Sequence, residues 1–312
     1  MIDLHLHSCY SNDGEWTPRA LVQKCADLGI GGMSITDHNC VRANREAEVA
    51  AKEYGIRYIP GIEIDCVYDG SPFHVLGYGI DFSSPDFETI EKNVRSQGRE
   101  ASLQMLAKTQ ALGFAITEAE MEYAARESYW PETWTGEMFA EVLLSKAEYA
   151  SHERLRPYRA GGARDDNPLV NFYWDFYSQG KPCHVEIHYP PMREIVDRIH
   201  QNGGLAVLAH PGMNLKGKEW LLEGIVQLGI DGLEAFSSYH SPQEAQKYWQ
   251  EAKKHALLTT CGSDFHGKTK PAIVLGNHGG WLAEETVWEV LLRHSTNKCS
   301  ENLHSTSLDE SE

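Results

Sequence analysis

The amino-acid sequence predicts an α/β fold in which parallel strands are covered by helices. Short apolar runs typical of strands alternate with amphipathic segments of helical period, and this alternation favours parallel strands joined through helices. Helix boundary signals agree with it, because Thr17 and Pro18 mark one predicted helix start and Gly29, Gly55 and Gly113 follow three predicted helices. A chain of 312 residues is long enough for one large α/β barrel or for two smaller domains.

The predicted elements follow one another in a regular order. The strand-like runs cover residues 2–7, 32–36, 58–66, 73–80, 205–209, 232–236 and 257–261. The helix-like segments cover residues 18–28, 42–54, 86–112, 192–201, 219–228, 242–255 and 283–293. Because His74 lies near the start of the run 73–80 rather than at its end, we expect this run to return from 58–66 as a hairpin.

Residues 115–182 interrupt this alternation. The stretch is rich in Trp, Tyr, Glu and Arg and mostly helical in character, so we expect a helical insertion that caps the candidate site. The α/β barrel domain would then comprise residues 1–114 and 183–295. The final segment, 296–312, has almost no apolar residues and is predicted to be disordered.

The composition excludes several classes of protein. Hydrophobic residues make up 41% and charged residues 23% of the chain, and no apolar run approaches the roughly 20 residues that cross a bilayer. A net charge of −17 argues against a long nucleic-acid groove, which needs a basic surface. No charged-then-apolar leader is seen and the seven cysteines form no CxxC pair, so we expect a cytoplasmic protein without a disulfide framework or a thiolate zinc site.

The first predicted strand places two histidines on one face. In the opening segment MIDLHLHS, side chains alternate between faces, so Asp3, His5 and His7 share one side and the leucines lie on the other. The apolar side can pack against helices while the opposite side presents the imidazoles as a fixed pair. Histidine is a common metal ligand but also a frequent bystander, so this motif by itself also fits two ordinary histidines on a polar face.

Metal-capable side chains also accompany the other predicted strands, and function collects at the carboxyl ends of parallel strands. They are His38, Glu63, His210, Asp264 and His266 at strand ends, His74 at the start of the returning strand, and Asp13 on the first loop. Together with His5 and His7 they give six imidazoles and three carboxylates, a ligand set that exceeds the needs of one ion and suits two or three Zn, Mn or Fe ions. Closely spaced metals activate water and clamp phosphoryl oxygens, so the predicted chemistry is hydrolysis of a phosphate ester.

These motifs together resemble the polymerase-and-histidinol-phosphatase (PHP) superfamily of phosphoesterases. The matching stretches are, in order, DLHLHSCYSNDG, ITDHN, PGIEI, FHVLGYG, LAVLAHPG and CGSDFHG, the last of which ends at residue 267. The stretch YSQGKPCHVEI, followed by AHPG and GSDFH, narrows the resemblance to nucleotide 3′-phosphatases and cyclic-phosphate phosphodiesterases. The resemblance implies a distorted (β/α)7 TIM-like barrel with a helical insertion and a trinuclear metal centre.

The resemblance also implies a role for each candidate ligand. His5, His7, Glu63 and Asp264 would hold the first ion, Glu63, His74 and His210 the second with Glu63 bridging, and Asp13, His38 and His266 the third. A hydroxide between the first two ions would attack phosphorus, which makes Glu63 and Asp264 central to catalysis. Mn²⁺ or Fe²⁺ is the metal that this branch implies, with Zn²⁺ as the alternative. Asp37 is expected to orient a ligand rather than to bind metal.

Two departures from the family pattern concern the substrate. Relatives begin an insertion helix with an Arg-Pro-His-like stretch where this chain has TWTGEMF at 133–139, and they carry arginine after the HPG turn where this chain has MNLKGK. A cationic phosphate contact is therefore missing or moved. Arg164 and Lys216 are candidates for it, although both, like Lys270, also fit solvent-exposed charges. His240 is a candidate general acid and substrate contact, or else a loop histidine without a chemical role.

Three classes of function compete on this evidence. The leading hypothesis is a metal-dependent phosphohydrolase for a small phosphate ester, such as a nucleotide 3′-phosphate, a nucleoside bisphosphate or a cyclic sugar phosphate, and a 5′-3′ exonuclease of short oligonucleotides is the alternative. An amidohydrolase-type C–N hydrolase would also begin with HxH, but it would carry a ligating lysine on a middle strand, and the sequence has none at such a position. An inactive regulatory domain should have lost ligands, whereas all nine positions are filled here.

Overall fold

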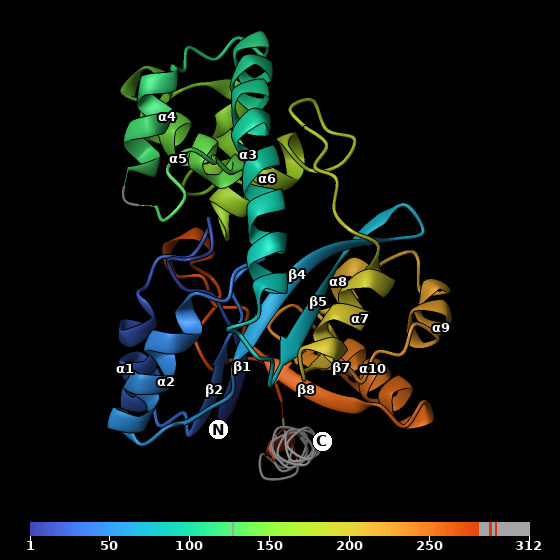
Figure 1. Cartoon of the computed structure of the whole chain (residues 1–312). Coiled ribbons are helices and arrows are strands. Elements are labelled where there is room, and N and C mark those ends of the chain that lie inside the picture. Colours follow the sequence, from blue (N-terminus) through green and yellow to red (C-terminus); the bar gives the residue numbers. More distant parts are fainter. Residues whose placement is uncertain (127, 281–286, 289–290, 292–312) are drawn as a thin grey trace, which may run out of the picture.

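The strands of the protein form two sheets (Figure 1), as described by a computed structural model that covers residues 1–126, 128–280, 287, 288 and 291. The three-stranded sheet is parallel and contains β1 (Ile2–Leu6), β2 (Gly32–Ile35) and β3 (Arg57–Tyr58). The five-stranded sheet contains, in spatial order, β4 (Gly61–Tyr68), β5 (Ser71–Tyr78), β6 (Leu205–Leu208), β7 (Gly232–Ser237) and β8 (Leu258–Gly262).

One hairpin reverses the otherwise parallel arrangement. β5 pairs antiparallel with both β4 and β6, whereas β6, β7 and β8 are parallel, so the expected hairpin return of the strand that carries His74 is confirmed. Isolated parallel bridges join the two sheets, from Leu6 to Phe265 and from His38 to Glu63. The predicted α/β fold of parallel strands and helices is confirmed, while the strand pairing divides the described strands between two sheets instead of one continuous barrel.

The predicted strand 58–66 is divided in two at Pro60, because proline has no N–H to donate to a ladder. The chain passes close to β2 at Gly61, where an added Cβ would lie only 2.3 Å from Ser34 Oγ. The Asn44 side chain fixes the start of β4, since its Nδ2 donates to the Gly61 carbonyl and its Oδ1 accepts from the Gly61 N–H, both at 2.9 Å. The break moves Glu63 into the five-stranded sheet, opposite His38.

Helices pack around both sheets, and the first of them begins at the predicted cap Thr17. They are α1 (Pro18–Asp27), α2 (Ala43–Tyr54), α7 (Met192–Gln201), α8 (Pro211–Asn214), α9 (Leu221–Val226) and α10 (Pro242–Lys254). Thr17 accepts the Ala20 N–H at the start of α1, and Ser241 and Glu244 form a capping box at the start of α10. The predicted helix 219–228 is shorter at both ends. The predicted helix 283–293, except for three of its residues, and the predicted tail 296–312 lie outside the described part of the chain.

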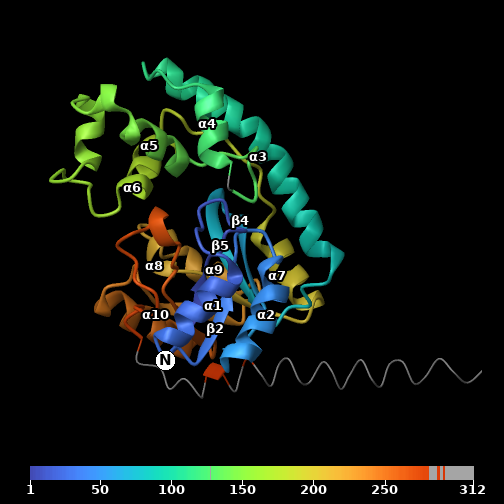
Figure 2. The ribbon, with the colours of Figure 1, turned by 90° about the vertical axis from the view of Figure 1, so that its left-hand side faces the viewer.

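A group of helices lies over one end of the sheets. The long helix α3 (Pro85–Ala111) leads away from the strands, and α4 (Glu118–Ala125), α5 (Gly136–Ser145), α6 (Pro168–Phe176) and the 3-10 helices Ala147–Tyr149 and Glu153–Tyr158 follow it. Figures 1 and 2 show this group on the side of the sheets opposite the N-terminus, so it faces the carboxyl end of β1. We call residues 115–182 the capping segment, and its division from the rest of the chain stays a prediction.

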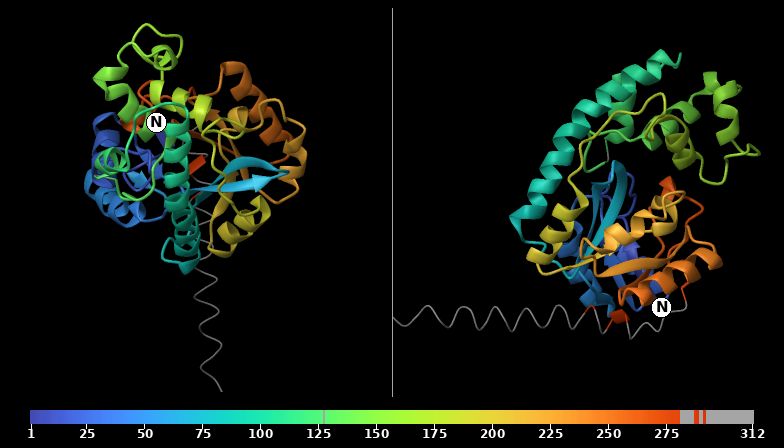
Figure 3. Two further views of the ribbon diagram at one scale, coloured as in Figure 1. Left: turned by 90° about the horizontal axis from the view of Figure 1, so that it is seen from above. Right: turned by 90° about the vertical axis from the view of Figure 1, so that its right-hand side faces the viewer.

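The capping segment has a hydrophobic core of its own, which includes Phe139, Leu143, Leu155 and Phe172 and also takes in Leu106 from α3. Figure 3 shows that the capping segment lies over the strands and that α3 runs alongside them. Two further apolar clusters lie on the sheets and the helices around them. None of the described helices is long and apolar enough to cross a membrane.

Candidate metal centre

Nine side chains that are far apart in the sequence converge at the carboxyl ends of the strands, and we call them the strand-end cluster. They are His5, His7, Asp13, His38, Glu63, His74, His210, Asp264 and His266. Their ligand atoms form three groups in which all atoms lie within 4.8 Å of one another, namely His5/His7/Glu63/Asp264, Glu63/His74/His210 and His7/Asp13/His38/His266. These groups coincide with the three ligand sets that the resemblance implied, and His7 additionally joins the third.

Glu63 lies at the centre of the strand-end cluster and faces two of these groups at once. Its Oε2 is 3.1 Å from His5 Nε2 and 3.2 Å from His7 Nε2, while its Oε1 is 3.0 Å from His74 Nδ1 and 3.1 Å from His210 Nε2. Burial on its own would raise the pKa of Glu63, but the surrounding histidines outweigh it and hold the pKa well below the usual range. A carboxylate that is ionised and faces ligands on both sides has the geometry of a bridge between two cations.

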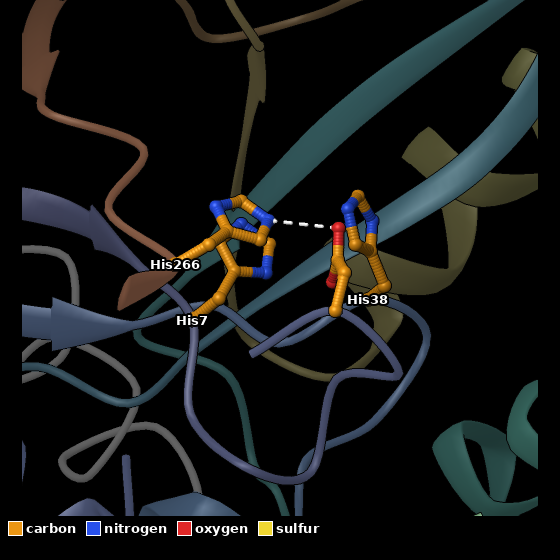
Figure 4. Close-up of side chains that lie close together, drawn as sticks. His7, His38 and His266 are labelled. Atoms are coloured by element: carbon orange, nitrogen blue, oxygen red, sulfur yellow. Dashed lines mark ion pairs between the residues drawn. The ribbon is translucent and has the colours of Figure 1, made fainter. Parts of the chain in front are cut away.

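Asp264 and the third group complete the strand-end cluster. Asp264 Oδ1 lies 3.0 Å from His7 Nε2 and 3.2 Å from His5 Nε2, on the side of Glu63 Oε2. His266 Nε2 lies 3.1 Å from Asp13 Oδ2. Figure 4 shows the rings of His7 and His266 beside each other, with centroids 3.9 Å apart and planes inclined by 19°, and His38 facing them.

Acceptors behind two of the histidines fix which nitrogen faces the strand-end cluster. His5 Nδ1 lies 2.9 Å from Glu234 Oε1, and a carboxylate oxygen only accepts, so His5 carries its proton on Nδ1. His266 Nδ1 donates to the Asp264 carbonyl oxygen at 2.8 Å. In both rings Nε2 is left without a proton and points into the cluster, as in histidines that bind a metal.

Ser11 has the same effect on His7. The Ser11 hydroxyl donates to Asp37 Oδ1 at 3.0 Å, so its oxygen accepts from His7 Nδ1 at 2.9 Å and from the His38 N–H at 2.9 Å. Asp37 in turn accepts from the Ser8 N–H and hydroxyl, both at 2.6 Å. Asp37 therefore orients a ligand through Ser11.

The strand-end cluster passes a test for metal binding that rests on its own atoms. Buried polar atoms are normally hydrogen-bonded, and leaving them unpaired costs free energy. Apart from His210 Nδ1, seven atoms of the strand-end cluster are buried without a hydrogen-bond partner, namely Nε2 of His5, His7 and His266, Nδ1 of His38, Oδ1 of Asp13, Oε2 of Glu63 and Oδ1 of Asp264. Divalent cations would satisfy all of them, and a nitrogen and oxygen set without thiolates suits Zn²⁺, Mn²⁺ or Fe²⁺.

Comparison with known proteins agrees with this chemistry. Residues 3–155 match the family model described as PHP domain. A 3′,5′-nucleoside bisphosphate phosphatase of Chromobacterium violaceum is 30% identical over 268 residues, which cover 85% of this chain and 87% of the relative. The chain belongs to the PHP domain family. The 5′-3′ exoribonuclease Rnm of Escherichia coli is 28% identical over 298 residues, 92% of each chain.

A solved structure supports the same family. A Bifidobacterium adolescentis protein assigned as a metal-dependent phosphoesterase superposes with a TM-score of 0.75 at 26% identity, over 94% of this chain and 96% of the other. This PHP protein is accordingly a metal-dependent phosphoric ester hydrolase, as its sequence predicted.

Two residues that support the PHP centre were not recognised in the sequence. Glu234 is a fully buried carboxylate on β7 that binds His5 through Oε1 and accepts the His210 N–H through Oε2 at 2.7 Å. A single charged residue inside the apolar strand GLEAFS was the available signal. Lys270 is not the surface charge that we expected, because its side chain is 14% exposed and its Nζ lies 2.8 Å from Asp264 Oδ2. Burial would lower the pKa of Lys270, but the charge of Asp264 outweighs it and raises the pKa well above the usual value.

The structure gives no support to a catalytic role for His240. Its Nε2 accepts the Gly212 N–H at 2.9 Å and its Nδ1 donates to the Ala235 carbonyl at 2.8 Å, so both ring nitrogens bind the main chain. An added Cβ on Gly212 would lie 2.5 Å from the His240 ring, which shows how closely the two segments approach. Burial lowers the pKa of His240 and favours this neutral form. His240 therefore positions the turn that carries His210.

The two candidate phosphate-binding cations lie in the capping segment and on the turn after α8. Arg164 is in the capping segment and pairs with Asp175 at 3.1 Å, and it also donates to the Asn171 carbonyl. Lys216 is exposed on the turn after α8. The expected roles of both residues in substrate binding find no support in this arrangement.

A cavity of about 640 Å³ lies between the strand-end cluster and the capping segment of this PHP protein. Its walls are the loop that follows β1, the helices α4 and α5, and the residues Lys268 and Thr269. Asp13, a member of the third ligand group, is one of its lining residues. The cavity therefore gives a small molecule access to the exposed side of the centre.

Proposed function

We propose that the strand-end cluster binds two or three divalent metal ions, Mn²⁺ or Fe²⁺ in preference to Zn²⁺, and hydrolyses a small phosphate ester. The observation that carries this proposal is the position of Glu63, whose two carboxylate oxygens face two different groups of histidines. We also propose that the two sheets act as one distorted (β/α)7 barrel, since the bridges at Leu6 and His38 join them on both sides.

Each ion would be held by one of the three ligand groups. The first group is His5, His7, Glu63 and Asp264, the second is Glu63, His74 and His210, and the third is Asp13, His38 and His266. When bound, the ions would supply a water of lowered pKa and positive charge for the phosphoryl oxygens.

The chain's own residues supply orientation. Glu234 and Ser11 fix the Nδ1 protons of His5 and His7, so both rings present a lone pair to the same place. Lys270 and the Tyr239 hydroxyl, 2.8 and 2.5 Å from Asp264 Oδ2, hold the oxygen of Asp264 that faces away from the histidines. The other oxygen, Oδ1, is therefore kept on the side of His5 and His7.

The substrate that fits best is a small phosphate ester such as a nucleotide 3′-phosphate, a nucleoside bisphosphate or a cyclic sugar phosphate. The relative from C. violaceum is named for a nucleoside bisphosphate. A cavity of about 640 Å³ is within the usual range for sites that bind small molecules.

Short oligonucleotides are the second candidate substrate, and one surface feature favours them besides the name of the E. coli relative. The rings of Tyr129 and Trp130 lie under Arg42 and Arg95, 5.6 and 4.7 Å from ring centroid to guanidinium, beside Tyr10 on the loop after β1. Aromatic rings with adjacent arginines are typical of surfaces on which unpaired bases stack. A C–N hydrolase is not favoured, because Lys270 forms an ion pair behind Asp264 and is not free to serve as a modified ligand.

The test combines metal analysis with phosphate release. The protein, loaded with Mn²⁺, is offered nucleoside 3′-phosphates, 3′,5′-bisphosphates, ribose cyclic phosphates and short oligonucleotides, with a chelated sample as control. We expect two or three bound ions and chelator-sensitive turnover of one substrate class. A protein that binds no metal, or whose turnover survives complete chelation, would contradict the proposal. Glu186→Gln, at an exposed loop position, is the control for changes at Glu63.

A further inference from the structure

The lining of the cavity between the loop after β1 and the capping segment is acidic. The charged side chains that line it are the carboxylates Asp13, Glu15, Glu120, Glu137 and Glu141 and the cations Arg126, Lys146 and Lys268. Among the lining residues, carboxylates thus outnumber cations five to three. A part of the substrate that carries a further negative charge would meet an unfavourable potential here.

The cations of this wall are already engaged. Lys268 Nζ pairs with Glu141 Oε1 at 3.1 Å, and Lys146 Nζ pairs with Glu120 Oε1 at 2.7 Å. Arg126 donates to a main-chain carbonyl three residues earlier in the chain, at 2.7 Å. These cations have local partners, so an incoming phosphate would have to compete with them.

Glu137 differs from the other carboxylates of the wall. Asp13 belongs to the third ligand group, and Glu120 and Glu141 have lysine partners, whereas no lysine or arginine within the described ranges pairs with Glu137. Burial and the nearby charge of Asp13 raise the pKa of Glu137 to about 7. Glu137 and Asp13 line the same cavity, so the charge of Asp13 acts on the Glu137 carboxyl group.

The position of Glu137 is fixed by its neighbour. Gly136 begins α5, and an added Cβ at this position would lie 2.9 Å from ring atoms of both Tyr173 and Tyr177. The start of α5 is thus packed directly against the end of α6. Glu137, the second residue of α5, is held by this contact at the cavity wall.

We propose that Glu137 determines substrate specificity, by accepting a hydrogen bond from a hydroxyl or amino group of the substrate next to the scissile phosphate and by disfavouring a second phosphate at that place. This inference rests on the proposed phosphoesterase function, which puts the scissile phosphate at the strand-end cluster. Above pH 7, where Glu137 is ionised, a carboxylate about 5 Å from a phosphate in a partly buried site repels it strongly enough to reduce turnover about 10- to 100-fold. Among nucleotide esters, the protein should therefore prefer a monophosphate to the matching bisphosphate.

The experiment compares kcat/KM for a nucleoside 3′-phosphate and the matching 3′,5′-bisphosphate. Wild type should prefer the monophosphate about 10-fold or more, Glu137→Gln should reduce this preference, and Glu137→Arg should reverse it, mainly through KM of the bisphosphate. Glu122→Gln removes an exposed carboxylate of α4 that is not among the residues lining the cavity, and it should leave the ratio within about twofold. Thermal unfolding and metal content measured on each variant verify that folding and the metal centre are retained.

The outcomes separate this inference from the proposed function. If wild type with bound metal hydrolyses neither nucleotide nor p-nitrophenyl phosphate, the phosphoesterase proposal fails and this one fails with it. If wild type hydrolyses the nucleotides but Glu137→Arg has the same ratio as wild type, or wild type prefers the bisphosphate, only the role of Glu137 is overturned. The Gln variant is nearly isosteric, so it gives the answer if the Arg variant does not fold.

Discussion

The strand-end cluster and the capping segment contribute to one site in different ways. His5 and Glu63 are 0% exposed and lie on strands. The hydrogen bond between His5 Nδ1 and Glu234 fixes the orientation of the His5 ring. Glu137 and its neighbours on the cavity wall are partly exposed and belong to inserted helices with a separate core. If both proposals hold, the comparison teaches that the reaction chemistry belongs to the sheets, while selectivity belongs to an added segment that can vary without disturbing the candidate ligands.

Among the changes that test this comparison, substitution of Glu63 in the strand-end cluster is expected to lower metal affinity most. Glu63→Gln keeps the size of the side chain but removes the charge that four histidines share. Loss of one partner from a buried charged set costs about 3–5 kcal/mol, and we therefore expect metal affinity to fall at least about 10²-fold, with a matching loss of phosphate release. Metal titration followed by mass spectrometry measures it. Metal affinity equal to that of wild type would show that Glu63 does not bridge the ions.

A smaller loss of metal affinity is expected for Glu234, which contacts two candidate ligands instead of the metal. Glu234→Gln replaces an acceptor for His5 Nδ1–H and the His210 N–H by an amide that cannot accept at both positions. Removal of such a partner typically lowers metal affinity about 10- to 100-fold. Nitrogen NMR of His5 should show a shift toward the other tautomer, which a purely structural role would not produce. An unchanged tautomer together with unchanged affinity would contradict the assignment.

Substitution of Ser11 should lower metal affinity less than substitution of Glu234, because the Ser11 hydroxyl is neutral. Ser11→Ala removes the link between Asp37 and His7 Nδ1. We expect metal affinity to fall about 10-fold, at the lower end of the range for residues that support ligands. Ser83→Ala, at an exposed turn, is the matched control and should leave affinity unchanged.

The smallest effect is a change in the free energy of unfolding that we expect for Glu137 in the capping segment. It can be measured on the metal-free protein. The folded protein raises the pKa of Glu137 from 4.5 to about 7, so the folded state binds this proton more tightly than the unfolded chain does. Its contribution to stability is complete below pH 4.5 and is lost as the pH rises through about 7. Glu137→Gln should therefore gain stability relative to wild type over this window. Urea unfolding at several pH values measures the difference, and a difference that does not change with pH would contradict it.

Several features could be read from local sequence. The alternation in MIDLHLHS places His5 and His7 on one face of a strand, and strand ends such as AHPG and CGSDFHG supply His210, Asp264 and His266. Period-two alternation and the direction of parallel strands are set by backbone geometry, so nine candidate ligands and the hairpin that carries His74 could be predicted without a structure. Pro60 could also have been recognised as a break, because a proline cannot donate within a ladder.

The tertiary structure decided what surrounds those ligands. Lys270 looks like a surface lysine in the sequence and becomes a buried partner of Asp264, while His240 looks like an acid and instead binds two main-chain groups. Local patterns specify which face a side chain takes, but its partners come from segments hundreds of positions away, as between His5 and Glu234. The sequence by itself therefore determined the α/β class and the candidate ligands, whereas the packing of distant segments decided the supporting residues and the charge of the cavity wall, because both depend on contacts that no local period encodes.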